Sequence, residues 1–198
     1  MESRHTLIGF ALLVLTVLVS GALAQEGAPS QEEMEAKWEK YATPGESHQL
    51  LDQFTGQWDL VMRWWMDPSA PPSEEKATAD VQWILGDRFL REDVSGTMMG
   101  QPFQGFHTIG YDNFKEKYLF SWIDNTSTGM TTGEGTYDPA KKEITYTGVM
   151  DDYMTGERNK PIRYVTRIVD RDKRVFEFHD QSRGEQSKMG EIIYTRRK

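Results

Sequence analysis

Ten short segments rich in aromatic and β-branched residues follow one another after Gly56, and this succession limits the possible folds more than any other feature. Turn residues separate the segments: Pro71-Pro72 cannot continue a β-ladder, and Gly86-Asp87 is a tight-turn pair. Their near-regular spacing is typical of an antiparallel meander. The predicted strands span residues 57–66, 78–85, 88–95, 103–111, 117–124, 130–138, 143–150, 162–170, 174–181 and 188–196, with a loop from 96 to 102.

A sheet of this many consecutive strands has two edges that the fold must protect from pairing with other chains. Closure into a barrel removes both edges, so we predict an all-β fold, an antiparallel up-and-down β-barrel of about ten strands. A β-sandwich is the competing architecture. The interior of an eight-stranded barrel is filled by side chains or holds one small ligand, and ten strands leave somewhat more room.

The segment that precedes the strands has a helical pattern instead. Met34, Trp38 and Tyr41 recur at the spacing of one helix face, which predicts a helix over residues 31–41. Ser47 is a suitable N-cap for a second short helix. We therefore expect one or two short N-terminal helices that cap the barrel.

The first residues have the organisation of an export signal. Arg4 precedes an apolar run over residues 7–19, and Ala22-Leu23-Ala24 supplies the small residues that a signal peptidase recognises. The run is shorter than the roughly 20 residues that span a bilayer, although an N-terminal membrane anchor is the alternative. We expect an exported protein, periplasmic or extracellular, with no stable membrane span after cleavage. The predicted parts are a signal peptide (1–24), a leader with capping helices (25–55) and a barrel domain (56–198).

Composition excludes several classes of function. The chain contains no cysteine, which removes disulfides, thiol catalysis and cysteine-based metal sites together. No metal-ligand spacing is present among the histidines and carboxylates. The formal net charge of −8 is spread along the chain, and this argues against a nucleic-acid partner, which would need clustered Lys and Arg. The sequence identifies no cofactor.

A series of short motifs in a fixed order resembles a known family. It is similar, over residues 45–197, to the bacterial domain-of-unknown-function family numbered 1579. The resemblance implies a calycin-like barrel, the fold of lipocalins, fatty-acid-binding proteins and nitrobindins, and it implies no reaction. The family often has Gly where this chain has Asp87, which we interpret as a turn variant. The motifs are His48-Gln49-Leu50-Leu51, Gly56-Gln57-Trp58, Ile84 to Leu90, Met99-Gly100, Phe103-Gln104-Gly105, Gly110-Tyr111-Asp112, Trp122-Ile123-Asp124, Gly133-Glu134-Gly135 and Tyr194-Thr195-Arg196.

The same resemblance implies a structural role for three residues. In lipocalins, a Gly-x-Trp pair on the first strand closes one end of the barrel, and an Arg near the last strand packs over the indole. Gly56, Trp58 and Arg196 match these positions. A guanidinium over a Trp face contributes about 0.5–2 kcal/mol.

His107 and His179 are the histidines that we place on strands. His107 alternates with Phe103 and Ile109, which places it on the more apolar face of its strand. It is either a hydrogen-bonded barrel histidine or a group that contacts a ligand or a haem. His179 shares a mixed face with Glu177, which faces either the lumen or solvent. His48, on the capping helix, is expected to be exposed.

Trp64 and Trp65 are adjacent on one strand, so their indoles face opposite sides of the sheet. We expect one to point into the barrel and the other to pack under the N-terminal helix through Trp38. Arg88 and Asp124 interrupt apolar strand ends, where a salt bridge at the barrel mouth or an acid–base role would account for them. The candidate barrel-lining residues are Trp64, Trp83, Arg88, His107, Trp122, Asp124, Tyr146 and His179.

The sequence favours a binding protein over an enzyme, and no residue is assigned a catalytic role. The leading hypothesis is a barrel that holds a small apolar or amphipathic ligand. One alternative is an enzyme in which His107, Asp124 or Arg88 acts on a small lumenal substrate. Another is a haem-binding barrel of the nitrobindin type. The aromatic interior predicted here is compatible with either a cavity or a dense core.

Overall fold

The structure is a computed structural model that describes residues 29–67, 69–153 and 155–198. The predicted signal peptide, residues 1–24, and the alternative membrane anchor both lie outside the described residues. Within the described ranges, no helix combines the length and the apolar character needed to cross a bilayer.

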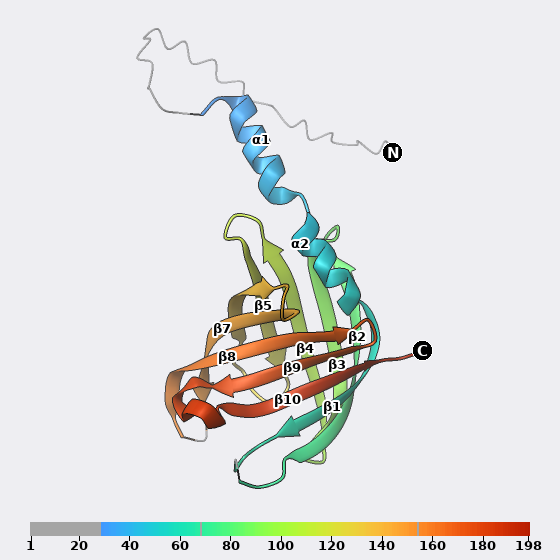
Figure 1. Cartoon of the computed structure of the whole chain (residues 1–198), viewed down its shortest axis with the longest axis vertical. Coiled ribbons are helices and arrows are strands. Elements are labelled where there is room, and N and C mark those ends of the chain that lie inside the picture. The colour runs from blue at the N-terminus through green and yellow to red at the C-terminus, as the bar shows by residue number, and fades with distance from the viewer. Residues whose placement is uncertain (1–28, 68, 154) are drawn as a thin grey trace, which may run out of the picture.

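The barrel is a single closed sheet. Each strand pairs antiparallel with its neighbour in the sequence, and β1 pairs with β10 to complete the ring (Figure 1). This order confirms the up-and-down barrel and excludes the sandwich. The strands are β1 (Gly56–Trp64), β2 (Ser73–Ile84), β3 (Phe89–Met98), β4 (Gln101–Asp112), β5 (Lys117–Asp124), β6 (Thr131–Asp138), β7 (Glu143–Asp152), β8 (Glu157–Asp170), β9 (Lys173–Asp180) and β10 (Lys188–Arg196), with a short 3-10 helix, η2 (Gln181–Gln186), before β10.

Several strands extend beyond their predicted ends. β3 and β4 continue through the predicted loop at 96–102 and leave only a tight turn at Met99-Gly100, where both residues have positive φ. β8 begins at Glu157, because its ladder with β7 continues to Asp152. The extensions consist of polar or mixed residues that pair through their backbones, so they lack the apolar alternation from which strands are predicted.

In the part of the chain from residue 29 onward, three helical segments precede the barrel: α1 (Gln31–Ala42), α2 (Glu46–Gln49) and the 3-10 helix η1 (Leu50–Phe54). α1 begins with a capping box between Ser30 and Glu33. It projects away from the barrel and buries no residue (Figure 1). Trp38 is 77% exposed. The prediction that Trp38 packs against the outward member of the Trp64-Trp65 pair is therefore wrong, because β1 ends at Trp64 on the side of the barrel opposite the helices.

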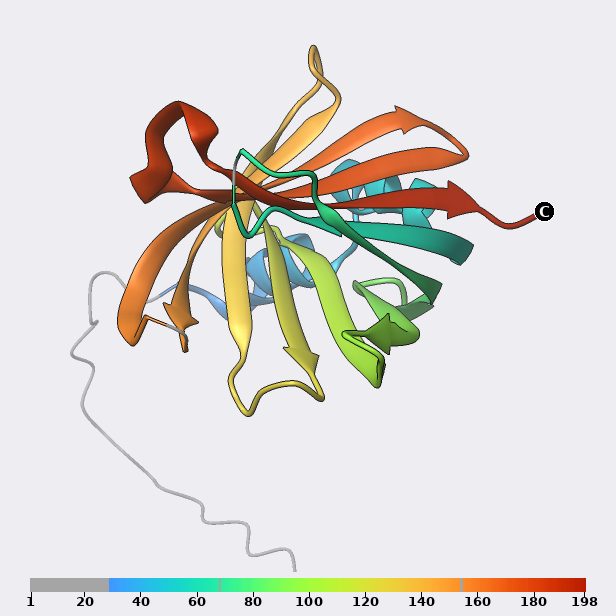
Figure 2. The same ribbon diagram turned by 90° about the horizontal axis from the view of Figure 1, so that it is seen from below.

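α2 and η1 cover one end of the barrel. In the view of Figure 2, this covered end lies behind the strands. Leu51 and Phe54 are fully buried there. His48 is also buried, contrary to the prediction, because α2 turns its ring toward Tyr111. Its Nδ1 accepts a hydrogen bond from the Gly45 N–H, and burial lowers its pKa.

Trp58 and Arg196 fasten this cap to the barrel. The Arg196 guanidinium lies 4.2 Å from the Trp58 ring centroid, as expected from the lipocalin-like motif. It also donates to the carbonyls of Gln53 and Thr55 at 2.7 and 2.5 Å. Gly56 has a φ of 99°, and a Cβ there would lie 2.9 Å from the guanidinium. A residue without a side chain is thus needed at this closure.

Candidate functional site

The open end of the barrel contains a cavity of about 220 Å³. Its rim includes Trp64, Met98 and Met150, which lie at the ends of β1, β3 and β7 that are farthest from the helical cap. Phe120, Phe176 and other aromatic side chains form its walls. The lining is predominantly apolar, with a few polar side chains, as in most small-molecule sites.

A buried cluster of charged groups lies beneath this cavity. Glu92 on β3 is fully buried, and its Oε2 lies 3.3 Å from Nδ1 of His107 and 3.3 Å from a terminal nitrogen of Arg174. The Arg174 guanidinium, in turn, stacks 3.8 Å from the ring centroid of Tyr194 and 4.7 Å from that of Phe54. The cluster thereby joins the floor of the cavity to the helical cap.

Burial raises the pKa of Glu92, but Arg174, His107 and Tyr194 outweigh this effect and hold it at about 2. The carboxyl group is therefore ionised at neutral pH and can only accept hydrogen bonds. Nδ1 of His107 consequently carries the proton that it shares with Glu92. Among the described residues, Glu92 Oε1 and Arg174 Nε are buried without a hydrogen-bond partner.

Tyr164 on β8 is a further polar group of the cavity wall. Its ring packs edge-on against Phe120, with ring centroids 5.0 Å apart. Burial raises the pKa of Tyr164 to about 12, so the hydroxyl stays protonated at neutral pH.

Of the predicted lining residues, Trp64, His107, Trp122 and Asp124 lie on the wall of the cavity. Glycines on neighbouring strands make room for the two indoles: a Cβ at Gly190 would lie 2.4 Å from the ring of Trp64, and a Cβ at Gly105 would lie 2.1 Å from that of Trp122. The Trp122 Nε1–H donates to Asp124 at 2.7 Å. Trp64 is thus the inward member of the Trp64-Trp65 pair.

The other four predicted lining residues lie elsewhere. Trp83 donates to Asp52 at the capped end, and Arg88 is exposed in the turn before β3, where it donates to the Gly86 carbonyl. His179 faces outward, because the inward position beside it belongs to Phe178. Tyr146 is buried against Phe120 in the packed core, outside the cavity lining.

Sequence reasoning missed Glu92 and Arg174. A signal for both was present, because each shares the inward face of its strand with apolar residues: Glu92 alternates with Leu90 and Val94, and Arg174 alternates with Phe176. A charged residue on an otherwise apolar strand face lies either at the edge of the sheet or in the interior beside a partner of opposite charge. Glu92 and Arg174 both lie in the barrel interior, where they pair with each other.

A metal ion or a haem would need protein side chains placed to bind it. Within the described ranges, no three His, Asp or Glu side chains are grouped to hold a metal ion. Both ring nitrogens of His179 are engaged, by Glu177 and Ser187. His107 has Nε2 free of partners among the described residues, but a cavity of about 220 Å³ holds only roughly nine non-hydrogen atoms, far fewer than a haem contains. The lumen does not fit a haem.

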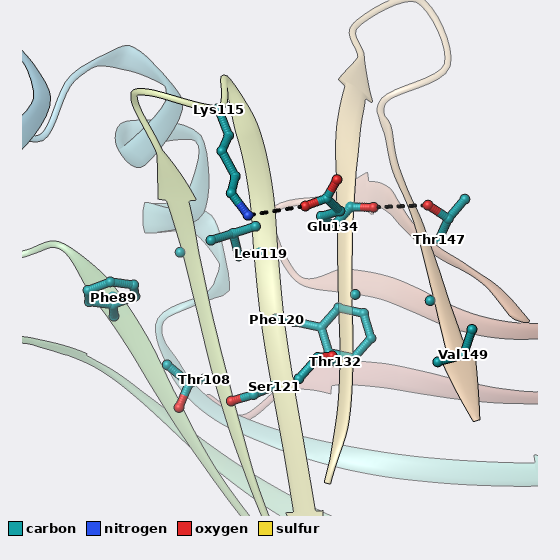
Figure 3. Close-up of a pocket in the computed structure, with 13 residues that line it drawn as sticks. Phe89, Thr108, Lys115, Leu119, Phe120, Ser121, Thr132, Glu134, Thr147 and Val149 are labelled. Atoms are coloured by element: carbon teal, nitrogen blue, oxygen red, sulfur yellow. Dashed lines mark hydrogen bonds and ion pairs between the residues drawn. The ribbon is translucent and has the colours of Figure 1, made fainter. Parts of the chain in front are cut away.

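A larger hollow of about 660 Å³ lies on the outer wall of the barrel (Figure 3). Leu119 and Val149 provide its apolar part, and Lys115 reaches across to Glu134 at 3.5 Å. The hollow is shallow and open, and both members of this ion pair are more than half exposed. Because the outer hollow has no buried polar group to orient a ligand, the lumen is the stronger candidate site.

Comparisons with known proteins agree with the barrel fold. The model of a family described as protein of unknown function, DUF1579, matches residues 43–196. The crystal structure of Rv2717c from M. tuberculosis superposes with a TM-score of 0.55 at 14% identity, over 79% of this chain and 100% of that chain. At this identity the likeness shows the fold alone. A redesigned beta barrel matches 76% of this chain and 95% of its own at 14% identity, with a TM-score of 0.38. No curated protein matches the sequence.

Proposed function

Because the chain belongs to the DUF1579 family, which is defined without a known function, we propose a function from its lumen: the protein binds a small, largely apolar molecule in the cavity at the open end of the barrel. The observation that carries this proposal is the combination of an aromatic cavity with a single oriented imidazole, that of His107. A core built only for stability would fill this space with side chains.

The cavity volume sets the size of the ligand. An apolar cavity of about 150 Å³ holds benzene, so about 220 Å³ accommodates roughly nine non-hydrogen atoms. Two fused rings of the size of indene or indole meet this limit. The aromatic walls favour a flat molecule, because ring faces and edges pack closely against one another.

The rim supports entry from the open end. Met98, Met150 and Met189 line the cavity there. Methionine side chains are unbranched and adapt their shape to what they contact. These side chains form an apolar entrance that can change its shape around an entering ligand while the strands keep their positions.

We also propose that the binding occurs outside the cytoplasm. The apolar run at 7–19 and the small residues at 22–24 support export, and cleavage after Ala24 would leave Gln25 as the first residue. N-terminal sequencing of the protein from an extracytoplasmic fraction tests this. Recovery of the protein only from the cytoplasmic fraction, with Met1 intact, would contradict it.

An enzymatic role has less support. It would need His107, Asp124 and Arg88 to meet at one substrate, within hydrogen-bond reach of it. Arg88 is bound to backbone carbonyls of an exposed turn. Asp124 lines the cavity but is engaged by Trp122 and Thr126. The remaining group, His107, has Glu92 beside its Nδ1, but that carboxylate is fully buried and paired with Arg174, so it is not placed to act on a substrate in the lumen.

The test of lumenal binding uses two variants of adjacent residues that face opposite sides of β7. Met150→Trp fills the mouth of the cavity, whereas Val149→Trp places the same indole on the outer wall, where Val149 is 52% exposed. Calorimetric titration with indene, an apolar probe of nine non-hydrogen atoms, should give saturable one-to-one binding to the natural protein. Met150→Trp should abolish this binding and Val149→Trp should leave it unchanged.

The matched pair also separates the two hollows of the molecule. Loss of indene binding in Val149→Trp alone would assign the ligand to the outer hollow. Absence of saturable binding to the natural protein would refute the proposed lumenal site.

A further inference from the structure

His107 presents an unused hydrogen-bonding atom to the lumen. The residue is 7% exposed and lines the cavity. Its Nδ1 faces Glu92, so Nε2 lies on the opposite side of the ring. Among the described residues, none makes a hydrogen bond to Nε2. A polar atom in an apolar pocket usually has a hydrogen-bond partner, and His107 lines the cavity from which a ligand could supply one.

The charge state of Glu92 decides which role this atom has. The carboxylate has no proton to donate, so Nδ1 of His107 must be the donor of the Glu92–His107 hydrogen bond. In a neutral imidazole only one ring nitrogen carries a proton, so Nε2 has a lone pair. In the neutral imidazole, Glu92 therefore fixes Nε2 as a hydrogen-bond acceptor.

Neighbouring groups keep this acceptor in place without competing for it. The rings of Phe120 and Trp122 pack at nearly right angles to the imidazole, with centroids 5.4 and 5.9 Å away. The indole N–H of Trp122 is already engaged by Asp124 at 2.7 Å. Two aromatic rings thus pack against the imidazole.

We propose that the lumen selects flat molecules of about nine non-hydrogen atoms that carry one N–H or O–H donor, and that this donor binds Nε2 of His107. The inference rests on the proposed lumenal function and deepens it by naming the class of ligand. Its physical basis is that a donor in an apolar pocket needs a partner, whereas an acceptor placed against Nε2 would leave two lone pairs facing each other.

The test compares indole with indene, which share shape and size but differ in one N–H. One hydrogen bond of this type should make indole bind roughly three- to tenfold more tightly than indene. Equal affinities would overturn the selection by His107 and leave lumenal binding intact. Failure of both probes to bind would refute the proposed function itself.

A second measurement needs no substitution. The ¹⁵N NMR signals of His107 in the natural protein should show a protonated Nδ1 and an unprotonated Nε2, and the Nε2 signal should move when indole is added but not when indene is added. His179 provides the control, because its two nitrogens are engaged by Glu177 and Ser187 and should not respond. A protonated Nε2 in the free protein at neutral pH would contradict the proposal.

His107→Phe removes the acceptor and keeps a ring in its place. The ratio of indole to indene affinity should fall to about one, since only apolar contacts remain. A retained preference for indole in this variant would overturn the assignment to His107. If the variant does not fold, the NMR result on the natural protein decides.

Discussion

The two ends of the barrel are built from the same ten strands but differ in how they are filled. At the capped end, Phe54, Trp58 and Tyr194 are buried, and Arg196 ties the cap to the strands through carbonyl hydrogen bonds. At the open end, Trp64 and Trp122 surround a cavity of about 220 Å³. The layer that contains Glu92, His107 and Arg174 separates the two.

This difference shows how one β-barrel can combine stability with a binding site. Strand alternation sends side chains inward at both ends alike. The capped end also has α2 and η1 to complete its packing, with Leu51 and Phe54 buried against the strands. The dense end supplies contacts that hold the fold, and the open end can retain a cavity because stability is not distributed uniformly.

The largest effect is expected in the buried charge layer formed by Glu92, His107 and Arg174, which separates the two ends. Arg174→Met leaves the fully buried Glu92 carboxylate without its charged partner, which should lower the free energy of unfolding by about 3–5 kcal/mol. Urea denaturation measures this loss.

The double variant Glu92→Leu/Arg174→Met is the control for that experiment. It removes both charges, so it should recover most of the lost stability. If the double variant is as unstable as Arg174→Met alone, the loss comes from packing and the layer does not act as an ion pair.

Acid should weaken the same layer. The pKa of Glu92 is about 2 in the folded protein against an ordinary value of 4.5, so its contribution is complete above pH 4.5 and is lost as the pH falls toward 2. The loss from this group should amount to a few kcal/mol at most. Urea denaturation at pH 7, 5 and 3.5 measures it, and the double variant should show a smaller decline between pH 5 and 3.5 than the natural protein.

The closure of the capped end should contribute less than the charge layer. Arg196→Met removes the contact with Trp58 and the hydrogen bonds to Gln53 and Thr55, at a cost of about 1–3 kcal/mol in urea denaturation. Arg91→Met is the matched control: its guanidinium lies 4.6 Å from the Phe106 ring centroid on the outer wall, where the side chain is exposed. It should show no measurable change. Equal losses in the two variants would remove the distinction between the ends.

The smallest effect on stability should come from changing Asp124, whose carboxylate lines the cavity at the open end. Asp124→Asn keeps an acceptor for the Trp122 indole and removes a partly exposed charge, so stability should change by no more than about 0.5 kcal/mol. Indene affinity should also stay within a factor of two. A large loss of affinity would show that the charge of Asp124 takes part in binding.

The fold was largely predictable because its signals are local. Turn residues such as Gly86-Asp87 end strands by their own conformations, and Trp58 and Arg196 meet as the family resemblance implies. The site was less predictable, because it depends on which residues face one another across the lumen. Glu92 and His107 are opposite each other only through the β3–β4 register.

Two incorrect predictions show that the sequence does not reveal which residues face one another in the folded barrel. Arg88 was predicted to line the barrel, but the turn that precedes β3 places it in solvent. His48 was predicted to be exposed, but the cap turns it inward against Tyr111. A pattern of alternating residues gives the face of a strand and does not specify the position of a turn or a capping helix relative to the barrel.

The most direct test of lumenal binding uses the methionines as reporters. Met62, Met98, Met150 and Met189 line the cavity, whereas Met34, Met66, Met99 and Met130 are exposed elsewhere. With ¹³C-methyl-labelled methionine and saturating indole, intermolecular NOEs should reach the methyl groups of the first set and none of the second. NOEs confined to the exposed methionines, or their complete absence at saturation, would contradict a ligand site inside the barrel.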